Sequence, residues 1–275
     1  MRTYQVSTSQ GNISIWDSQA AGKPVLLIHG NNGCMEVFSH QFESDLAQKY
    51  RFIALDLPGH GNSDKAHTPQ DTYNIEGYAD VVMEVIKKME LVNPVVVGWS
   101  LGGHVGINLL QKSQKLAGLL ITGAPPIDFS GDGFKEGFLP VPGFERLYSK
   151  IEFSKEDAVE MIHRIGGFDT EKAPFIVEAA LKTDGYARHY LAQSLKTGIG
   201  GNQKEIVETN NTPLCVVQGK NEKGINNKYI IEKINYKNLF DHVYVVEGAG
   251  HAVFWEKPEA FNQILSTFLS KVFAN

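Results

Sequence analysis

Cysteine is scarce in this chain of 275 residues, and metal-binding motifs are missing. Only Cys34 and Cys215 are present, too few for a disulfide framework and not spaced as metal ligands, so the sequence assigns neither a role. The nine histidines include no H-x-H or H-E-x-x-H pair. We therefore expect no metal, no other cofactor and no metal-dependent hydrolysis.

Long apolar runs and an excess of basic charge are also missing. No apolar stretch approaches the ~18 residues that cross a bilayer, and the polar start, Met1–Asn12, lacks the apolar centre of a signal peptide. The net charge is -5 and the basic residues are dispersed, which disfavours nucleic acid and anionic membranes as partners. We expect a cytoplasmic protein whose partner is a small-molecule substrate. Its oligomeric state does not follow from the sequence.

The alternation of short β-type runs with helical patterns predicts the fold class. Such alternation is typical of βαβ units around a parallel sheet, and the continuous apolar runs Pro24–His29 and Pro94–Gly98 suit central strands covered on both faces. We expect an α/β fold with a mostly parallel central sheet and helices on both faces. The other expected strands are 4–8, 12–17, 51–56, 116–122, 213–218 and 242–247, and the expected helices are 73–90, 101–112 and 259–273.

The alternation breaks down between residues 125 and 208. This stretch begins with closely spaced glycines and prolines and continues with helical patterns that have no clear strands between them. A segment this long is rarely a structureless loop inside a domain. The sequence therefore predicts a core formed by 1–124 and 209–275, with an inserted helical lid over 125–208.

The stretch Gly98–Gly102 reads G-W-S-L-G, which matches the G-x-S-x-G pattern of a nucleophile on a tight turn. Such a serine has to stand on a strained turn between a strand and a helix, where side chains in place of the flanking glycines would collide with the packed elements. A chance match in a glycine-rich loop is the alternative. Because the pattern here follows an expected buried strand and precedes an expected helix, we predict that Ser100 is a nucleophile.

A serine hydroxyl needs a general base, which in turn is oriented by an acid. In folds with this turn the chain order is serine, acid, histidine. His251 follows the last expected strand and is the predicted base. Glu222 follows the 213–218 strand and is the predicted acid, with Asp128, which follows the preceding strand, as the alternative.

Ester chemistry also needs two N–H donors for the oxyanion that develops during attack. The backbone N–H of Leu101, directly after Ser100, is the first predicted donor. The second is expected in the loop after the 24–29 strand, from Asn31 or, as the alternative, Asn32. His104 is expected to be a helix residue packed under the turn.

These motifs together resemble the α/β-hydrolase superfamily: H-G at His29, D-L-P-G-H-G at 56–61, G-W-S-L-G-G at 98–103 and G-A-G-H at 248–251. A narrower resemblance is to the metal-independent N-acyl homoserine lactonases of this fold, and the segments that carry it are 98–107, 121–126, 183–185 and 200–207. That resemblance implies hydrolysis of the lactone ring of quorum-sensing signals, which is quorum quenching. It also implies a glutamate as the acid, in agreement with Glu222.

The lid departs from these lactonases at one position. They place a substrate-contacting tyrosine there, whereas the matching stretch of this chain, 160–164, has Met161 near that position. The acyl-chain preference therefore does not follow from the resemblance. The residues expected to contact the substrate are Gly30, Trp99, Phe134, Phe138 and Met161.

The same serine, histidine and acid suit more than one function. The predicted reaction is lactone opening through an acyl-enzyme, and the alternatives are a general carboxylesterase, another serine-dependent hydrolase of small acyl esters, or a ligand receptor on a hydrolase scaffold. Epoxide hydrolases and haloalkane dehalogenases are disfavoured, because they carry an aspartate where this chain has Ser100.

Overall fold

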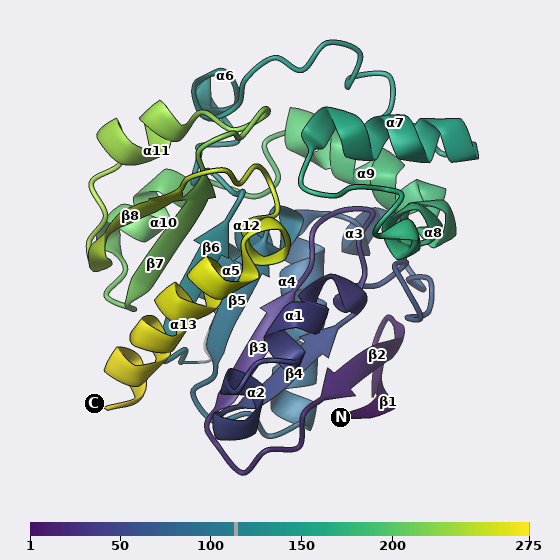
Figure 1. The fold of residues 1–275 in the computed structure, drawn as a ribbon. Helices are drawn as coiled ribbons and strands as arrows, with labels where there is room; N and C mark the ends of the chain where they lie inside the picture. The colour runs from purple at the N-terminus through teal and green to yellow at the C-terminus, as the bar shows by residue number, and fades with distance from the viewer. Residues whose placement is uncertain (113–114, 275) are drawn as a thin grey trace.

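The computed structural model describes residues 1–112 and 115–274, and its centre is an eight-stranded sheet (Figure 1). The strands are β1 (Arg2–Thr8), β2 (Gly11–Asp17), β3 (Pro24–Ile28), β4 (Arg51–Leu55), β5 (Val95–Trp99), β6 (Gly118–Thr122), β7 (Leu214–Gly219) and β8 (Leu239–Val246). Their order is β1-β2-β4-β3-β5-β6-β7-β8. The six strands from β3 to β8 run parallel, and β1 and β2 form an antiparallel hairpin at one edge. The predicted α/β fold with a mostly parallel sheet is confirmed.

Helices cover both faces of the sheet, as Figure 1 shows. In the first half of the chain they are η1 (Met35–Phe38), α1 (Ser39–Phe42), α2 (Leu46–Lys49), α3 (Pro69–Thr72), α4 (Ile75–Lys88) and α5 (Leu101–Leu109). After β7 they are α11 (Asn227–Glu232), α12 (Val253–Glu256) and α13 (Pro258–Phe273). Helices α4 and α5 pack on one face, and α1, α2, α12 and α13 pack on the other.

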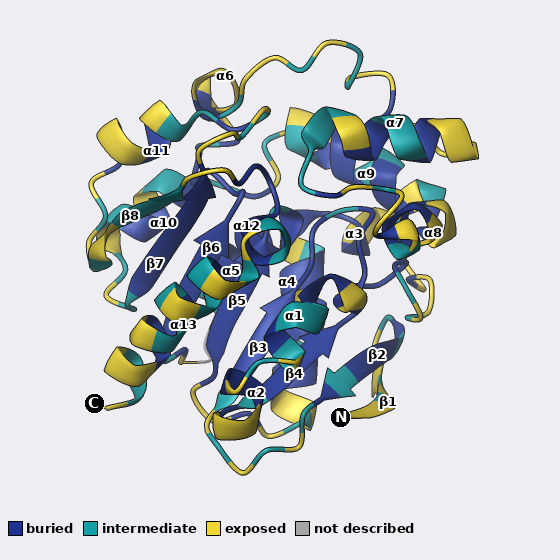
Figure 2. Cartoon of the chain, in the orientation of Figure 1, coloured by how far each residue is buried: buried dark blue, intermediate teal, exposed yellow. Residues whose placement is uncertain are grey.

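The central strands are apolar throughout because each side chain enters one of two cores. On β3, Leu26 and Ile28 join the core that contains α4 and α5, whereas Val25 and Leu27 join the core that contains α13. Successive residues of a strand point to opposite faces, so a strand covered on both faces has no solvent-facing position. Figure 2 shows the result, a buried central sheet between helices that expose only their outer sides.

Five helices form an insertion between β6 and β7: α6 (Gly133–Gly137), α7 (Lys155–Ile165), α8 (Pro174–Lys182), α9 (Gly185–Lys196) and α10 (Gln203–Thr209). The first four lie over the carboxyl ends of the parallel strands (Figure 1). The last, α10, packs against α5 instead, where the Gln203 amide donates to the backbone oxygen of His104 at 2.9 Å. Although α10 begins inside the expected lid, it belongs to the helical layer of the sheet.

Some boundaries differ from those expected. Strand β1 begins at Arg2 and strand β8 at Leu239, both earlier than predicted, and the helix after Ser100 ends at Leu109. The short helices between residues 35 and 49 were not predicted, because each is too short to show a helical period. Among the described residues, no helix has the length and hydropathy needed to cross a membrane.

Arg188 on α9 is the largest side chain that is fully buried, and it joins the insertion to the core. Its Nε donates to the backbone oxygen of Lys150 and its Nη2 to that of Ile151, both at 2.8 Å. Its Nη1 donates to Asn32 Oδ1 at 3.0 Å and to the oxygen of Ala180 at 3.1 Å. The guanidinium therefore ties three segments of the insertion to the loop after β3.

We expect Arg188→Met to lower the free energy of unfolding by about 3–5 kcal/mol, because its buried acceptors lose their donors and the methionine side chain has no donor to replace them. The measurement is urea denaturation followed by fluorescence. Lys196→Met changes an exposed cation on the same helix and serves as the matched control, with an expected change within about 0.5 kcal/mol. Equal effects of the two substitutions would contradict the anchoring role of Arg188.

Candidate active site

Ser100 stands on a strained turn between β5 and α5. Its backbone angles, φ of 53° and ψ of -117°, lie outside the regions that residues other than glycine ordinarily adopt. A Cβ on Gly98 would lie 2.3 Å from the oxygen of Gly102, and a Cβ on Gly102 would lie 2.1 Å from the oxygen of Ile28. The strand and helix pack so closely at this turn that both flanking positions require glycine.

His251 and Glu222 meet beside that turn. The loop after β8 carries His251 and the loop after β7 carries Glu222, and His251 Nδ1 lies 2.8 Å from Glu222 Oε2. Both side chains are almost fully buried. Gly123, at the end of β6, allows the imidazole to come close, because a Cβ there would lie 2.9 Å from His251 Cε1. The indole of Trp99 donates to the backbone oxygen of His251 at 3.0 Å and holds the loop from below.

The surroundings of Glu222 keep its carboxyl ionised. Burial by itself raises the pKa of this carboxyl, but the neighbouring His251, through charge and hydrogen bonding, lowers it. The backbone N–H groups of Lys223 and Gly224 donate to Oε1 at 2.9 and 3.1 Å and lower it further. The net pKa lies below the ordinary value for glutamate. A carboxylate held in this way orients the imidazole with Nδ1 protonated, so that Nε2 is free to accept a proton.

Asp128, the alternative acid, has different partners. Its Oδ1 accepts from the backbone N–H of Ser130 at 2.9 Å and from the hydroxyl of the same residue at 2.6 Å. The structure therefore places Glu222, and not Asp128, against the imidazole of His251.

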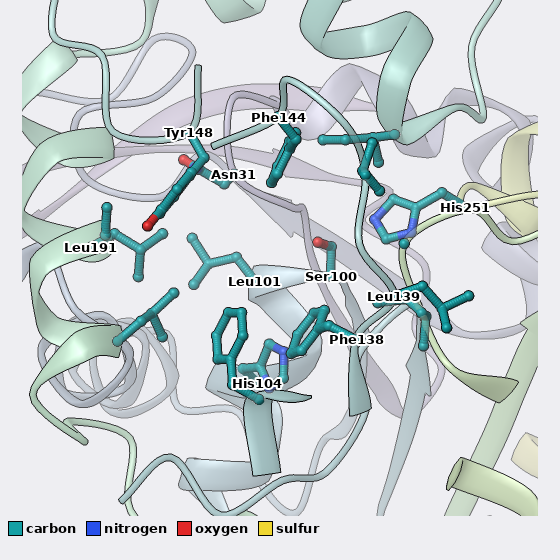
Figure 3. Close-up of a pocket in the computed structure, with 18 of the residues that line it drawn as sticks. Asn31, Ser100, Leu101, His104, Phe138, Leu139, Phe144, Tyr148, Leu191 and His251 are labelled. Carbon is teal, nitrogen blue, oxygen red and sulfur yellow. The ribbon is translucent and has the colours of Figure 1, made fainter. Parts of the chain in front are cut away.

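Ser100 and His251 line one cavity, in which Figure 3 shows both side chains. Among the described residues, no hydrogen bond joins Ser100 Oγ to the imidazole. Such bonds in unliganded enzymes are often long and tighten when substrate binds.

The backbone N–H groups of Asn31 and Leu101 have no acceptor within the described residues, and both residues line the same cavity. Leu101 is the first residue of α5, where helix N–H groups are unpaired and the helix dipole is positive. The backbone N–H of Asn32, the alternative donor, is already bonded to Asn31 Oδ1 at 3.1 Å. Asn31 and Leu101 thus each have a free N–H group at the cavity, as an oxyanion-binding site requires.

The cavity has a volume of about 210 Å³ and is lined mainly by apolar side chains (Figure 3). Its walls come from α6 and the segment after it, from α9 and from the residues around Ser100. Two of the residues predicted to contact substrate, Phe134 and Phe138, line it, and their rings stack with centroids 4.5 Å apart.

Three other residues predicted to contact substrate are not among those that line the cavity. Met161 is buried in the packing of α7, with 3% of its surface exposed. The ring of Trp99 packs against those of Phe168 and Phe254. Gly30 lies against Ser100 and Trp99, where a Cβ would meet both side chains at 3.0 Å. These three residues pack beneath or beside residues of the site and do not line the cavity themselves.

Several cavity residues were not predicted. They include Ile75, Phe129, Leu139, Tyr148, Leu191 and Leu195. The α9 residues carried a signal, since Leu191 and Leu195 are spaced by one helical turn and share a face. Sequence could not show whether that face turned toward the core or toward a cavity. Within the described part of the chain, no group of three or more histidine, cysteine or acidic side chains could hold a metal ion.

Comparison with known proteins gives the family. The alpha/beta hydrolase fold family matches residues 23–258. The chain belongs to this family. It is a hydrolase, and its solved relatives include the N-acyl homoserine lactonase AidH in complex with N-butanoyl homoserine, which is 34% identical. The two chains superpose with a TM-score of 0.92, and the match covers 99% of this hydrolase and 97% of that structure.

More distant relatives have the same fold. A thermophilic esterase from Thermogutta terrifontis is 22% identical, with a TM-score of 0.78 and coverage of 99% of both chains. The 2-hydroxy-6-oxononadienedioate/2-hydroxy-6-oxononatrienedioate hydrolase of Escherichia coli (strain K12) is 23% identical over 93% of this hydrolase and 90% of the relative.

We expect Glu222→Gln to lower kcat for any ester or lactone substrate by about 10²- to 10⁴-fold, because the amide cannot stabilise the imidazolium that forms during attack. Steady-state kinetics with p-nitrophenyl butyrate measure this directly. Asp128→Asn is the matched control, with an expected change within about 3-fold, or about 0.65 kcal/mol. A larger loss in Asp128→Asn than in Glu222→Gln would reverse the assignment of the acid.

Proposed function

We propose that this hydrolase opens the lactone ring of N-acyl homoserine lactones through an acyl-enzyme, and so degrades quorum-sensing signals. The observation that supports this most is the similarity to the lactonase AidH, which extends over nearly the whole chain, the insertion included. The matched region thus includes the insertion, which supplies much of the cavity wall.

In the first half of the reaction, Ser100 Oγ attacks the lactone carbonyl while His251 takes its proton. Glu222 stabilises the imidazolium, and the N–H groups of Asn31 and Leu101 hold the oxyanion. Collapse of the tetrahedral intermediate breaks the ring C–O bond, and His251 returns the proton to the leaving oxygen. The product of this half is an acyl-enzyme whose alcohol remains attached to the acyl group.

In the second half, His251 removes a proton from water, and the resulting hydroxide attacks the acyl-enzyme. The same two N–H groups hold the second oxyanion, and the proton on His251 returns to Ser100 Oγ. The released product is the open-chain N-acyl homoserine.

The acyl tail occupies the apolar part of the cavity, and the insertion acts as a lid over it. Side chains from α6 and α9 line this part, with Phe138 and Leu191 on two of its sides (Figure 3). Transfer of an aliphatic chain out of water contributes about 0.8 kcal/mol per buried CH₂. The tail therefore contributes affinity that positions the lactone at Ser100.

General ester hydrolysis is the second candidate, because the same groups cleave open-chain esters and solved esterases share the fold. An esterase would act well on p-nitrophenyl esters and poorly on lactones. Because both functions use the same catalytic residues, a comparison of substrates distinguishes them, whereas removal of a catalytic residue does not.

We expect the purified protein to open N-hexanoyl homoserine lactone with kcat/KM above about 10⁴ M⁻¹s⁻¹, a value in the ordinary range for enzymes. Mass spectrometry of the ring-opened product, corrected for spontaneous hydrolysis, is the measurement. Ser100→Ala should lower the rate to background. Turnover of p-nitrophenyl butyrate without lactone opening would favour the esterase, and turnover of neither would favour a receptor.

We expect Leu191→Trp to lower kcat/KM for N-decanoyl homoserine lactone at least about 10-fold more than for the N-butanoyl compound, because the larger side chain fills space that only a long tail needs. Tyr186→Trp, a substitution at an exposed position of the same helix, is the control and should leave the ratio unchanged. An equal loss for both chain lengths would place the tail elsewhere.

A further inference from the structure

His104 occupies a position of the cavity wall that the reaction above does not use. It follows Ser100 by one turn of α5, and its backbone N–H donates to the oxygen of Ser100 at 3.2 Å. Its ring lies beside Phe138 at the base of the cavity in Figure 3, and only 7% of the residue is exposed. A polar ring in a mainly apolar wall needs a partner or a role.

A buried amide fixes which ring nitrogen of His104 carries the hydrogen. The Nε2 of Gln203 donates to the backbone oxygen of His104 at 2.9 Å and to Asn108 Oδ1 at 2.7 Å. Its Oε1 is therefore the acceptor, 2.7 Å from His104 Nδ1. Because Gln203 is fully buried and both ends of its amide are bonded, it cannot turn over without losing these bonds. The hydrogen of His104 is on Nδ1, and Nε2 carries a lone pair.

The ring of His104 is neutral at pH 7. Burial lowers the pKa of His104 to about 4, and the hydrogen bond to Gln203 offsets this only in part. Among the described residues, Nε2 has no hydrogen-bond partner, and it is not one of the unpartnered side-chain atoms that are fully buried. The side chain thus presents one acceptor, and no donor, to the cavity.

His104 lies close to the nucleophile along the chain and faces the same cavity. It comes one turn after Ser100 on α5, and both residues line that cavity. A substrate that is bound with its scissile carbonyl at Ser100 therefore shares the cavity with the unpartnered Nε2 of His104.

We propose that His104 is the residue that selects substrates with an N–H on the carbon next to the scissile carbonyl, and that its Nε2 accepts a hydrogen bond from this N–H. The inference deepens the proposed lactonase function and rests on it for the identity of the substrate. An acyl-amide substituent supplies the donor, whereas an acyloxy or alkyl substituent leaves the lone pair of His104 unpaired in an apolar wall.

The test compares paired substrates that differ in one atom. N-Hexanoyl homoserine lactone is paired with the lactone that has an ester oxygen in place of the amide N–H. The phenyl ester of N-hexanoylalanine is paired with that of O-hexanoyl-lactic acid, so that the same difference is tested on open-chain esters. The readout is the ratio of kcat/KM within each pair. This ratio is independent of the fraction of enzyme that is folded.

We expect the wild type to favour the amide member about 10- to 100-fold. In His104→Phe, which keeps an aromatic ring but has no acceptor, the ratio should fall to within about 3-fold of unity. His104→Gln, which can present an amide oxygen, should restore part of the preference. A ratio that is equal in the wild type and His104→Phe would overturn the inference.

The two proposals fail in different ways. If the lactones are opened but the ratio does not depend on His104, the lactonase function holds and this inference is wrong. If the lactones are not opened but the open-chain pair shows a preference that depends on His104, the inference holds and the lactonase function is wrong. Turnover of neither pair by the wild type overturns both.

Discussion

The close contact between helix α5 and the ends of strands β3 and β5 is the constraint on which the site depends. Gly102 lies against the backbone of Ile28, and Gly98 lies against that of Gly102, so the turn between them cannot relax. Ser100 is therefore held at positive φ, with the free N–H groups of the helix beside it. His251 comes from the other end of the chain and reaches this turn because Gly123 leaves space for its ring.

The insertion turns this reactive centre into a pocket with a defined shape. Apolar side chains of α6 and α9 form its walls, and Arg188 of α9 donates to Asn32 in the loop that also carries Asn31. The proposed tail-binding wall and the proposed oxyanion loop thus share one anchor.

Buried neutral histidines give this site much of its polar framework. Burial lowers the pKa of His29 to about 4, and burial together with the neighbouring His29 lowers that of His60 to about 3. The Nε2 of His29 accepts from the backbone N–H of Leu57 at 3.0 Å, and His60 lies beside Asn31. These two rings shape the loop after β3. His104 is also buried, but it lines the cavity and its Nε2 has no partner among the described residues. Burial alone therefore does not distinguish a histidine that supports a loop from one that faces the cavity.

The parallel sheet and the turn at Ser100 were predictable from local pattern. Chain order gave His251 and Glu222 as candidates, but only the structure brought Glu222, and not Asp128, to His251. A strand buried on both faces must be apolar throughout, and a turn without space must have glycine, so both features are written in neighbouring residues. Met161 and Tyr148 show what the local pattern of the sequence could not predict. Sequence position suggested the first as a substrate contact, but the structure buries it in helix packing and places the second in the cavity. Which face of a lid helix meets the substrate depends on contacts between residues far apart in the chain, and only the tertiary structure decides those.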